Sequence, residues 1–157
     1  MNSLLLREGE PAPDFELPAP GNRKIRLSQF RGEKNVVIGF HPLAWTPVCA
    51  LQMKGLEENS SAFKASDTVA LGISVDAVPS KTAWAESLGI KEVLLLSDFE
   101  PKGEVARLYG VYRDSGFSER AVFLVDKEGI IRFARVYPIK EVPDLSPVLA
   151  LLKETGE

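Results

Sequence analysis

The sequence predicts an α/β fold in which helices flank a mixed central β-sheet. Residues 35–40 and 68–75 are continuous apolar runs without alternation, a pattern typical of strands buried on both faces. Helical spacing of apolar residues follows each run, so strands and helices alternate as they do in parallel sheets. Later in the chain, two apolar runs are separated only by a turn at residues 126–129, which favours an antiparallel hairpin.

The N-terminal part is predicted to add a small hairpin of its own. Residues 11–20 contain too many prolines for a helix, and Phe15 and Leu17 alternate with polar residues as in an edge strand. Gly21 and Asn22 predict a turn into a second alternating strand. In chain order we expect a short arm over residues 1–9, an edge strand around residues 15–17, a strand over residues 24–27 and one helical turn over residues 28–32.

The middle of the chain alternates strands with helices that have recognisable ends. Pro47 favours a helix start, and apolar side chains recur at helical spacing from there to about residue 65. Gly89 and Gly110 are placed to end the next two helices. In chain order we expect a strand over residues 35–40, a helix over 47–65, a strand over 68–75, a helix over 79–88, a strand over 93–97 and a helix over 102–109.

The C-terminal part changes to an antiparallel pattern. Strands over residues 121–125 and 130–136 form the hairpin, and a closing helix follows over residues 144–153. A parallel start with an antiparallel finish predicts a thioredoxin-like fold with a mixed central sheet flanked by helices and an extra N-terminal β-hairpin. The length of 157 residues fits a single domain, residues 1–157.

Composition excludes several classes of protein. The net charge of −3 argues against a nucleic-acid binder, which needs a basic excess. No apolar run approaches the roughly 20 residues that span a bilayer, so we expect no membrane segment. The run Leu4–Leu6 is too short for the core of a signal peptide, and we therefore expect a cytoplasmic protein.

The chain contains one cysteine, Cys49, and one histidine, His41. A single cysteine excludes an intramolecular disulfide and a redox pair of the CxxC type. A zinc site built from Cys and His is also excluded, because such sites usually need four ligands. A Ser-His-Asp hydrolase would have to use His41 as its base. We expect neither a metal nor an organic cofactor.

The segment between the first buried strand and the next helix carries the chemistry. Thr46 favours a helix N-cap and Pro47 the first helical position, so Cys49 falls in the first turn, near the positive end of the helix dipole. To be mostly ionised at neutral pH, a thiol needs its pKa lowered from about 8.5 to about 6.5. This corresponds to roughly 2.7 kcal/mol of stabilisation of the thiolate. A helix end supplies about 2 kcal/mol at most, so a nearby cation is required. Alternatively, Cys49 is a small buried apolar residue.

Several motifs resemble the peroxiredoxins of the AhpC/TSA superfamily, which are thiol peroxidases on a thioredoxin-like fold. The resemblance extends over about residues 10–136, and the lone cysteine is most similar to the one-cysteine, AhpE-like branch. The matching motifs, in chain order, are Pro13-Asp-Phe-x-Leu17, Pro42-x-x-x-Thr46-x-x-Cys49, Ser74-Val-Asp76 with Trp84, Ser97-Asp98 with Tyr109-Gly-Val111, and Arg120-Ala-Val-Phe-Leu-Val-Asp-Lys-Glu-Gly129.

The resemblance implies roles for four residues. Arg120 would be the required cation, stabilising the thiolate and holding a peroxide oxygen. The hydroxyl of Thr46 would both cap the helix and bind the peroxide, and Pro42 would shield the thiol from water. Cys49 would attack hydrogen peroxide or an organic hydroperoxide and become a sulfenic acid.

The chain has no second cysteine, so the resemblance implies that an external thiol regenerates the enzyme: a thioredoxin-like protein, a glutaredoxin-like protein or a low-molecular-weight thiol. It also implies a homodimer packed near the active site. The candidate dimer contacts are Trp45, Val78, Pro79 and Phe117.

Some features leave alternatives open. Gln52 stands where many peroxiredoxins have Glu, and His41 either faces the pocket or packs beneath it. The nearness of His41 to Cys49 also leaves a Cys-His hydrolase open. Two other functions remain: a peroxide sensor with the same activated thiolate, and a non-enzymatic binding module of thioredoxin fold with an inert Cys49.

Overall fold

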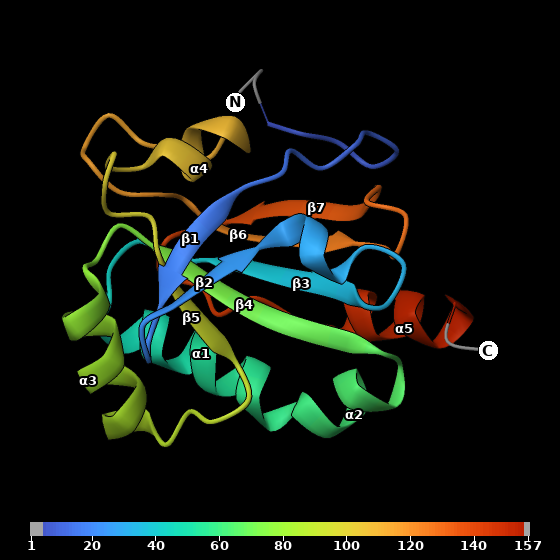
Figure 1. Cartoon of the computed structure of the whole chain (residues 1–157), viewed down its shortest axis with the longest axis horizontal. Helices are drawn as coiled ribbons and strands as arrows, with labels where there is room; N and C mark the ends of the chain where they lie inside the picture. The colour runs from blue at the N-terminus through green and yellow to red at the C-terminus, as the bar shows by residue number, and fades with distance from the viewer. Residues whose placement is uncertain (1–4, 156–157) are drawn as a thin grey trace.

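The computed structural model describes residues 5–155, and its centre is a five-stranded sheet of order β5-β4-β3-β6-β7 (Figure 1). The parallel part pairs β3 with β4 and β4 with β5, whereas β6 and β7 run antiparallel. The sheet is therefore mixed, as predicted. The strands are β3 (Asn35–Phe40), β4 (Thr68–Ser74), β5 (Leu94–Ser97), β6 (Arg120–Val125) and β7 (Ile131–Tyr137).

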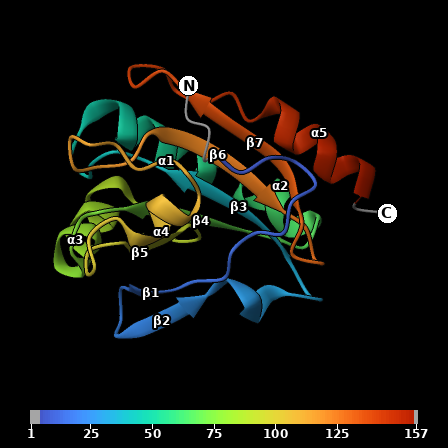
Figure 2. The same ribbon diagram turned by 90° about the horizontal axis from the view of Figure 1, so that it is seen from above.

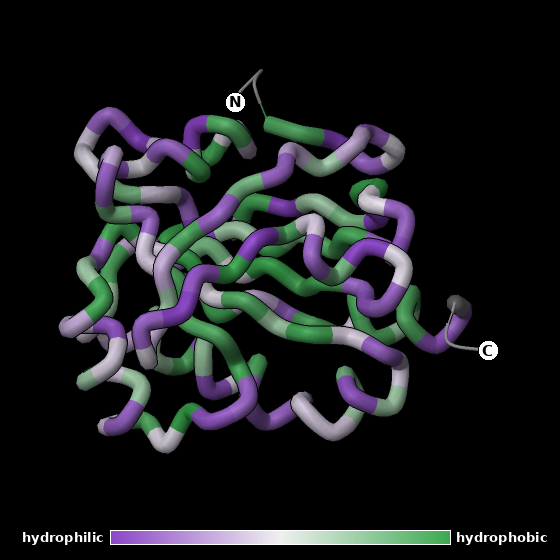
Figure 3. The backbone as a smooth tube through the Cα atoms, viewed as in Figure 1, coloured by the Kyte–Doolittle hydropathy of each residue, from purple (hydrophilic) through white to green (hydrophobic). Residues whose placement is uncertain are grey.

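Helices and the N-terminal hairpin cover opposite faces of this sheet (Figure 2). One face packs against α1 (Pro47–Glu58), α2 (Ser60–Ala65), α3 (Val78–Leu88) and α5 (Ser146–Thr155). The other face packs against the hairpin and α4 (Glu104–Leu108). All six residues of β3 are buried, and they alternate between the two cores, which explains the continuous apolar run. Figure 3 shows the same concentration of hydrophobic residues in the central strands.

The predicted extra hairpin is present as a separate sheet of β1 (Glu16–Ala19) and β2 (Arg23–Arg26), followed by a 3₁₀ turn at Leu27–Phe30. The arm predicted for residues 1–9 lies partly outside the described residues. Over the described residues it is not a free arm: Leu5 and Leu6 pack against the core, and the N–H of Gly9 donates to the carbonyl of Ile131 at 2.7 Å.

The predicted helix over residues 47–65 is wrong in one respect, because it breaks at Asn59. The side chain of Asn59 donates to the carbonyl of Gly55 at 2.8 Å, and its backbone leaves the helical region at φ −97° and ψ 11°. Asn is a weak helix former because its side chain competes for backbone groups in this way. The segment is therefore two helices, α1 and α2, which meet at this residue.

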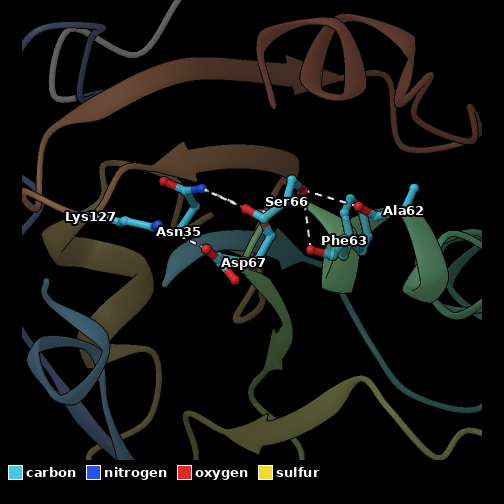
Figure 4. A network of polar contacts seen from close by, with 7 residues as sticks. Asn35, Ala62, Phe63, Ser66, Asp67 and Lys127 are labelled. Atoms are coloured by element: carbon cyan, nitrogen blue, oxygen red, sulfur yellow. Dashed lines mark hydrogen bonds and ion pairs between the residues drawn. The ribbon is translucent and has the colours of Figure 1, made fainter. Parts of the chain in front are cut away.

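A polar network closes one end of the sheet (Figure 4). The side chain of Asn35 donates to the carbonyl of Ser66 at 3.2 Å, and Lys127 pairs with Asp67 at 3.1 Å. The hydroxyl of Ser66 lies 3.0 and 3.1 Å from two carbonyls of α2. These contacts join the turn before β4 to the start of β3 and to the β6–β7 turn. The opposite end, where β3, β4 and β5 finish and β6 begins, holds the candidate functional side chains.

Among the described residues, no helix has the length and apolar character that crossing a bilayer requires.

Candidate active site

Residues 41–46 connect β3 to α1 and are held by the segment that follows β4. The N–H of Ala44 donates to Oδ2 of Asp76 at 2.7 Å, and Nε1 of Trp45 donates to Oγ of Ser80 at 3.0 Å. Trp45 has a φ of +70°, a left-handed conformation that costs a non-glycine residue about 1–2 kcal/mol. The two side-chain contacts hold the connection in this shape.

Cys49 is the third residue of α1 and only 1% exposed. The sequence prediction of its place in the first helical turn is therefore correct. The N–H groups of Val48 and Cys49 have no acceptor within the helix, because the first turn lacks preceding carbonyls in register. The positive end of the helix dipole thus lies at the sulfur, which favours the thiolate.

Arg120 lies beside this sulfur although 71 residues separate the two in the chain. Its Nη1 donates to Sγ of Cys49 at 3.3 Å and to Oε1 of Gln52 at 2.8 Å, and its Nε donates to the carbonyl of Ile139 at 2.8 Å. Arg120 is the first residue of β6, and the antiparallel pairing of Ala121 with Phe40 places it at the end of β3. Arg120 as a whole is 2% exposed, so solvent weakens the field of its guanidinium little.

Gln52 lies one turn after Cys49 on α1 and is buried. Its oxygen accepts from Arg120, and its Nε2 donates to the carbonyl of Phe40 at 3.2 Å. Both ends of the amide are therefore used. A carboxylate in this place would lack a donor for the Phe40 carbonyl and would offset part of the charge of Arg120. The structure thus gives Gln52 a contact role that the sequence left open.

The predicted side-chain cap of Thr46 is wrong. Thr46 is the N-cap residue by its extended backbone, but its hydroxyl makes no capping hydrogen bond. Oγ1 instead donates to the carbonyl of Leu43 at 2.7 Å. The hydroxyl oxygen keeps its lone pairs for another donor, and the N–H groups of the first turn receive nothing from Thr46. Pro42 lies between the buried strand end and this turn and is itself buried.

His41 is fully buried, and both of its ring nitrogens contact groups other than the sulfur of Cys49. Its Nδ1 lies 3.4 Å from the carbonyl of Gly39, and its Nε2 lies 2.9 Å from Nζ of Lys81. Burial, followed by the charge of Lys81, holds the pKa of His41 well below its ordinary value of 6.5. The ring is thus neutral and engaged elsewhere, and the nucleophile–base contact of a Cys-His hydrolase is not formed.

Lys81, a fully buried lysine of α3, was not predicted from the sequence. The sequence did contain a signal for its burial. Lys81 precedes Trp84 by three residues and therefore lies on the same face of the helix. Trp84 is 2% exposed and its ring centroid lies 5.3 Å from that of His41.

The two tryptophans differ in exposure. Trp45 on the active-site connection is 54% exposed, whereas Trp84 is buried. Leu43 and Leu51 on the same connection and helix are also exposed. Phe117 and Val78 are half-buried and Pro79 is exposed. The predicted dimer residues are therefore all at least partly open to a partner.

Within residues 5–155, no group of three His, Cys, Asp or Glu side chains is arranged to hold a metal ion.

Comparison with known proteins gives consistent matches over most of the chain. The profile of the AhpC/TSA family matches residues 9–134. Alkyl hydroperoxide reductase E of Mycobacterium tuberculosis is 40% identical over 141 residues, which cover 89% of this chain and 92% of that protein. A chloroplastic 2-cysteine peroxiredoxin of Chattonella marina is 36% identical and is covered to 72%, with 85% of this chain matched. The crystal structure of reduced 2-Cys peroxiredoxin from Plasmodium vivax superimposes with a TM-score of 0.85 at 29% identity, covering 94% of this chain and 81% of that one.

Proposed function

The chain belongs to the AhpC/TSA family and is a peroxiredoxin, a thiol-dependent peroxidase, and we propose that Cys49 is its peroxidatic residue. The single observation that carries this assignment is the 3.3 Å contact between Nη1 of Arg120 and the sulfur of Cys49 in the first turn of α1. A buried guanidinium and a helix N-terminus together supply the stabilisation that a thiolate needs at neutral pH.

In the proposed reaction, the Cys49 thiolate attacks one oxygen of a hydroperoxide. A sulfur–oxygen bond forms, the oxygen–oxygen bond breaks, and sulfur loses two electrons to the peroxide. The leaving oxygen departs as hydroxide or alkoxide and takes up a proton, giving water or an alcohol. Hydrogen peroxide and organic hydroperoxides both satisfy this scheme, and the products are a Cys49 sulfenic acid and water or the alcohol.

Negative charge spreads over sulfur and both oxygens in the transition state, and we assign three donors to that charge. They are the guanidinium of Arg120 and the N–H groups of Val48 and Cys49. We assign Thr46 a complementary role. Its hydroxyl donates a hydrogen bond to the carbonyl of Leu43 at 2.7 Å, so its oxygen is oriented to accept a hydrogen bond from the O–H of the incoming hydroperoxide.

We assign Pro42 the task of limiting water at the thiol. It is buried, it has no N–H group that would need a partner, and it fixes the chain where β3 ends. No metal or organic cofactor enters the proposed reaction. One domain, residues 1–157, carries the whole proposed site.

The sulfenic acid must be reduced by a thiol from outside the chain, because Cys49 is the only cysteine. The external thiol attacks the sulfenic sulfur, forms a mixed disulfide and releases water. A second reductant thiol then attacks the mixed disulfide, forms a disulfide with the first reductant thiol and releases the Cys49 thiolate. The reductant is a thioredoxin-like protein, a glutaredoxin-like protein or a low-molecular-weight thiol. We place the enzyme in the cytoplasm, where such thiols are kept reduced.

We also propose a homodimer that packs around the active-site connection. Trp45, Phe117, Val78 and Pro79 are its expected contacts, and the exposed indole of Trp45 is the largest of them. Sedimentation at micromolar concentration should give twice the monomer mass. Trp45→Ser should shift the equilibrium toward the monomer, whereas Leu108→Ser, which removes another exposed apolar side chain from α4, should not. A monomer at these concentrations would contradict the assignment.

Stopped-flow tryptophan fluorescence of the reduced protein tests the peroxidase assignment directly. Mixed with hydrogen peroxide, the protein should react orders of magnitude faster than free cysteine, and Cys49→Ser should show no such phase. A rate equal to that of free cysteine, with the mass of Cys49 unchanged, would refute the assignment and favour the binding module with an inert thiol. A fast phase without turnover by thioredoxin-like proteins, glutaredoxin-like proteins or small thiols, with the oxidation passing instead to a different partner protein, would indicate the sensor.

A further inference from the structure

Lys81 is a buried cation that the proposed reaction does not use. Its side chain is fully enclosed in α3, where Nζ donates to Oγ of Ser74 at 2.7 Å and lies 2.9 Å from Nε2 of His41. Among residues 5–155, no carboxylate is within ion-pair distance of this ammonium. A buried cation without a direct counter-ion is costly, and such groups are retained where they serve a purpose.

The contacts of Lys81 lead to the active-site connection by two routes. In the first, the hydroxyl of Ser74 donates a hydrogen bond to Oδ2 of Asp76 at 2.7 Å, and the same oxygen accepts a hydrogen bond from the N–H of Ala44 at 2.7 Å. In the second, Lys81 holds the ring of His41, the residue directly before Pro42. Both routes end on the residues that position α1 and therefore Cys49.

The charge of Lys81 also interacts electrostatically with Cys49, which is buried in the same part of the protein. Burial lowers the pKa of Lys81 from 10.5 to about 7, and nearby negative charges oppose that fall. Four other titratable groups face the Lys81–His41 pair. Asp76 after β4, Asp98 after β5 and Cys49 on α1 act on Lys81, and Arg120 on β6 acts on His41.

Packing places the pair close to the helix of Cys49. A Cβ atom built on Gly72 of β4 would lie 2.5 Å from Sδ of Met53 and 3.4 Å from Cε1 of His41. Met53 follows Cys49 by one turn on the same face of α1. The imidazole therefore lies beside α1, and Nζ of Lys81 contacts its Nε2 at 2.9 Å. Because the coupling of two charges is reciprocal, a thiolate that stabilises the ammonium is stabilised by it in return.

We propose that Lys81 is a positioning residue of the peroxidase site, whose buried ammonium holds the 41–46 connection through His41 and Ser74–Asp76 and gives the Cys49 thiolate a second positive charge besides Arg120. This inference rests on the proposed function of Cys49. It adds a group that acts through its neighbours and through its charge, without contact with the peroxide.

The test measures the thiolate of Cys49 by its absorbance at 240 nm against pH, with Cys49→Ser as the blank. Lys81→Met keeps the length of the side chain and removes the charge. Its ionisation midpoint should move to higher pH, lowering the thiolate fraction at the wild-type midpoint by at least about threefold. Lys91→Met, which removes an exposed lysine just after α3, should follow the wild-type curve.

Peroxide kinetics on the same samples separate the charge from a general loss of structure. The rate constant of Lys81→Met should fall in proportion to its thiolate fraction at low pH and approach the wild-type value at high pH. A folded Lys81→Met protein with the wild-type absorbance curve would overturn the inference, whatever its Tm. In that case a fast wild-type reaction would leave the proposed function intact, since that function depends on Cys49 and Arg120.

Two further measurements distinguish the charge from the tether and do not depend on Lys81→Met folding. Ser74→Ala keeps the ammonium and removes its link to Asp76, so the Cys49 curve should stay near the wild-type one. A shift as large as that of Lys81→Met would overturn the role of the charge. In ¹³Cε-lysine NMR, Lys81 should titrate at lower pH in Cys49→Ser than in the reduced wild type, and identical titrations would also overturn it.

Discussion

Arg120→Met removes the guanidinium while keeping an unbranched side chain of similar length at the start of β6. The lost charge lies 3.3 Å from the sulfur, and both groups are buried. At an effective dielectric constant of about 20, two unit charges about 4 Å apart interact by about 4 kcal/mol. Single opposite charges at such distances move ionisation midpoints by about 1–3 pH units. At a pH below both midpoints, the thiolate fraction should therefore fall by about tenfold to a thousandfold.

The assay combines thiolate absorbance against pH with the rate of reaction with hydrogen peroxide. Arg120→Met should lose rate by more than the thiolate fraction alone explains, because it also removes a donor to the peroxide oxygen. Arg120→Lys is the matched control. It keeps the charge, but one ammonium cannot replace the guanidinium at Cys49, Gln52 and Ile139 together. An intermediate midpoint and an intermediate rate are expected.

Stability has to be measured in parallel, because Arg120→Met also leaves two acceptors without their donor. They are Oε1 of the buried Gln52, which should cost about 1–3 kcal/mol of unfolding free energy, and the carbonyl of the half-buried Ile139, which should cost less because water can reach it. A folded Arg120→Met protein that ionises and reacts as the wild type does would refute the electrostatic reasoning. A loss of stability alone would confine Arg120 to a structural role.

The remaining predictions concern three residues. Cys49→Ser should abolish peroxide reduction and keep the circular dichroism spectrum of the wild type; residual turnover would exclude Cys49 as the peroxidatic residue. Thr46→Val should lose the hydrogen bond to Leu43, about 1 kcal/mol in urea denaturation, and should also slow the peroxide reaction; full activity would limit Thr46 to shaping the turn. Excess peroxide should convert Cys49 to the sulfinic acid, seen by mass spectrometry as two oxygens added to the reduced thiol, because no second cysteine traps the sulfenic acid. The pKa of Lys81 is about 7 in the native state against 10.5 unfolded, so the unfolded chain binds more protons between these values and wild-type stability should rise with pH there. Lys81→Met should therefore gain most relative to the wild type near pH 7 and least near pH 10; a stability difference independent of pH would contradict this.

The sheet was predictable because burial on two faces leaves a strong trace in sequence. Residues 35–40 read as a buried strand and form β3 with those bounds. The break at Asn59 was not predictable from apolar spacing, because the residues on both sides keep the helical period. The break arises from a local side-chain contact to Gly55. A single side chain that competes for backbone groups leaves no periodic signal.

The site was predictable only in its local part. The sequence placed Cys49 in a first helical turn, since Pro47 and the preceding strand fix that geometry. Arg120 was identified by family resemblance alone, because its contact depends on the register of β6 against β3. The cap of Thr46 was mispredicted for a related reason. Tertiary contacts of Ala44 and Trp45 shape the turn so that the carbonyl of Leu43 competes successfully for the hydroxyl.

Gln52 explains how the site keeps its positive charge. The guanidinium of Arg120 needs an acceptor beside the sulfur, and a carboxylate would satisfy it while offsetting the charge that the thiolate requires. The amide accepts the same hydrogen bond without a net charge, and its other end satisfies the Phe40 carbonyl. Similarly, Lys81 meets a hydroxyl and a neutral imidazole, with the carboxylate of Asp76 one hydroxyl farther away. Both buried cations therefore contact neutral acceptors, which leaves the thiolate of Cys49 as the only anion in hydrogen-bond contact with either of them among the described residues.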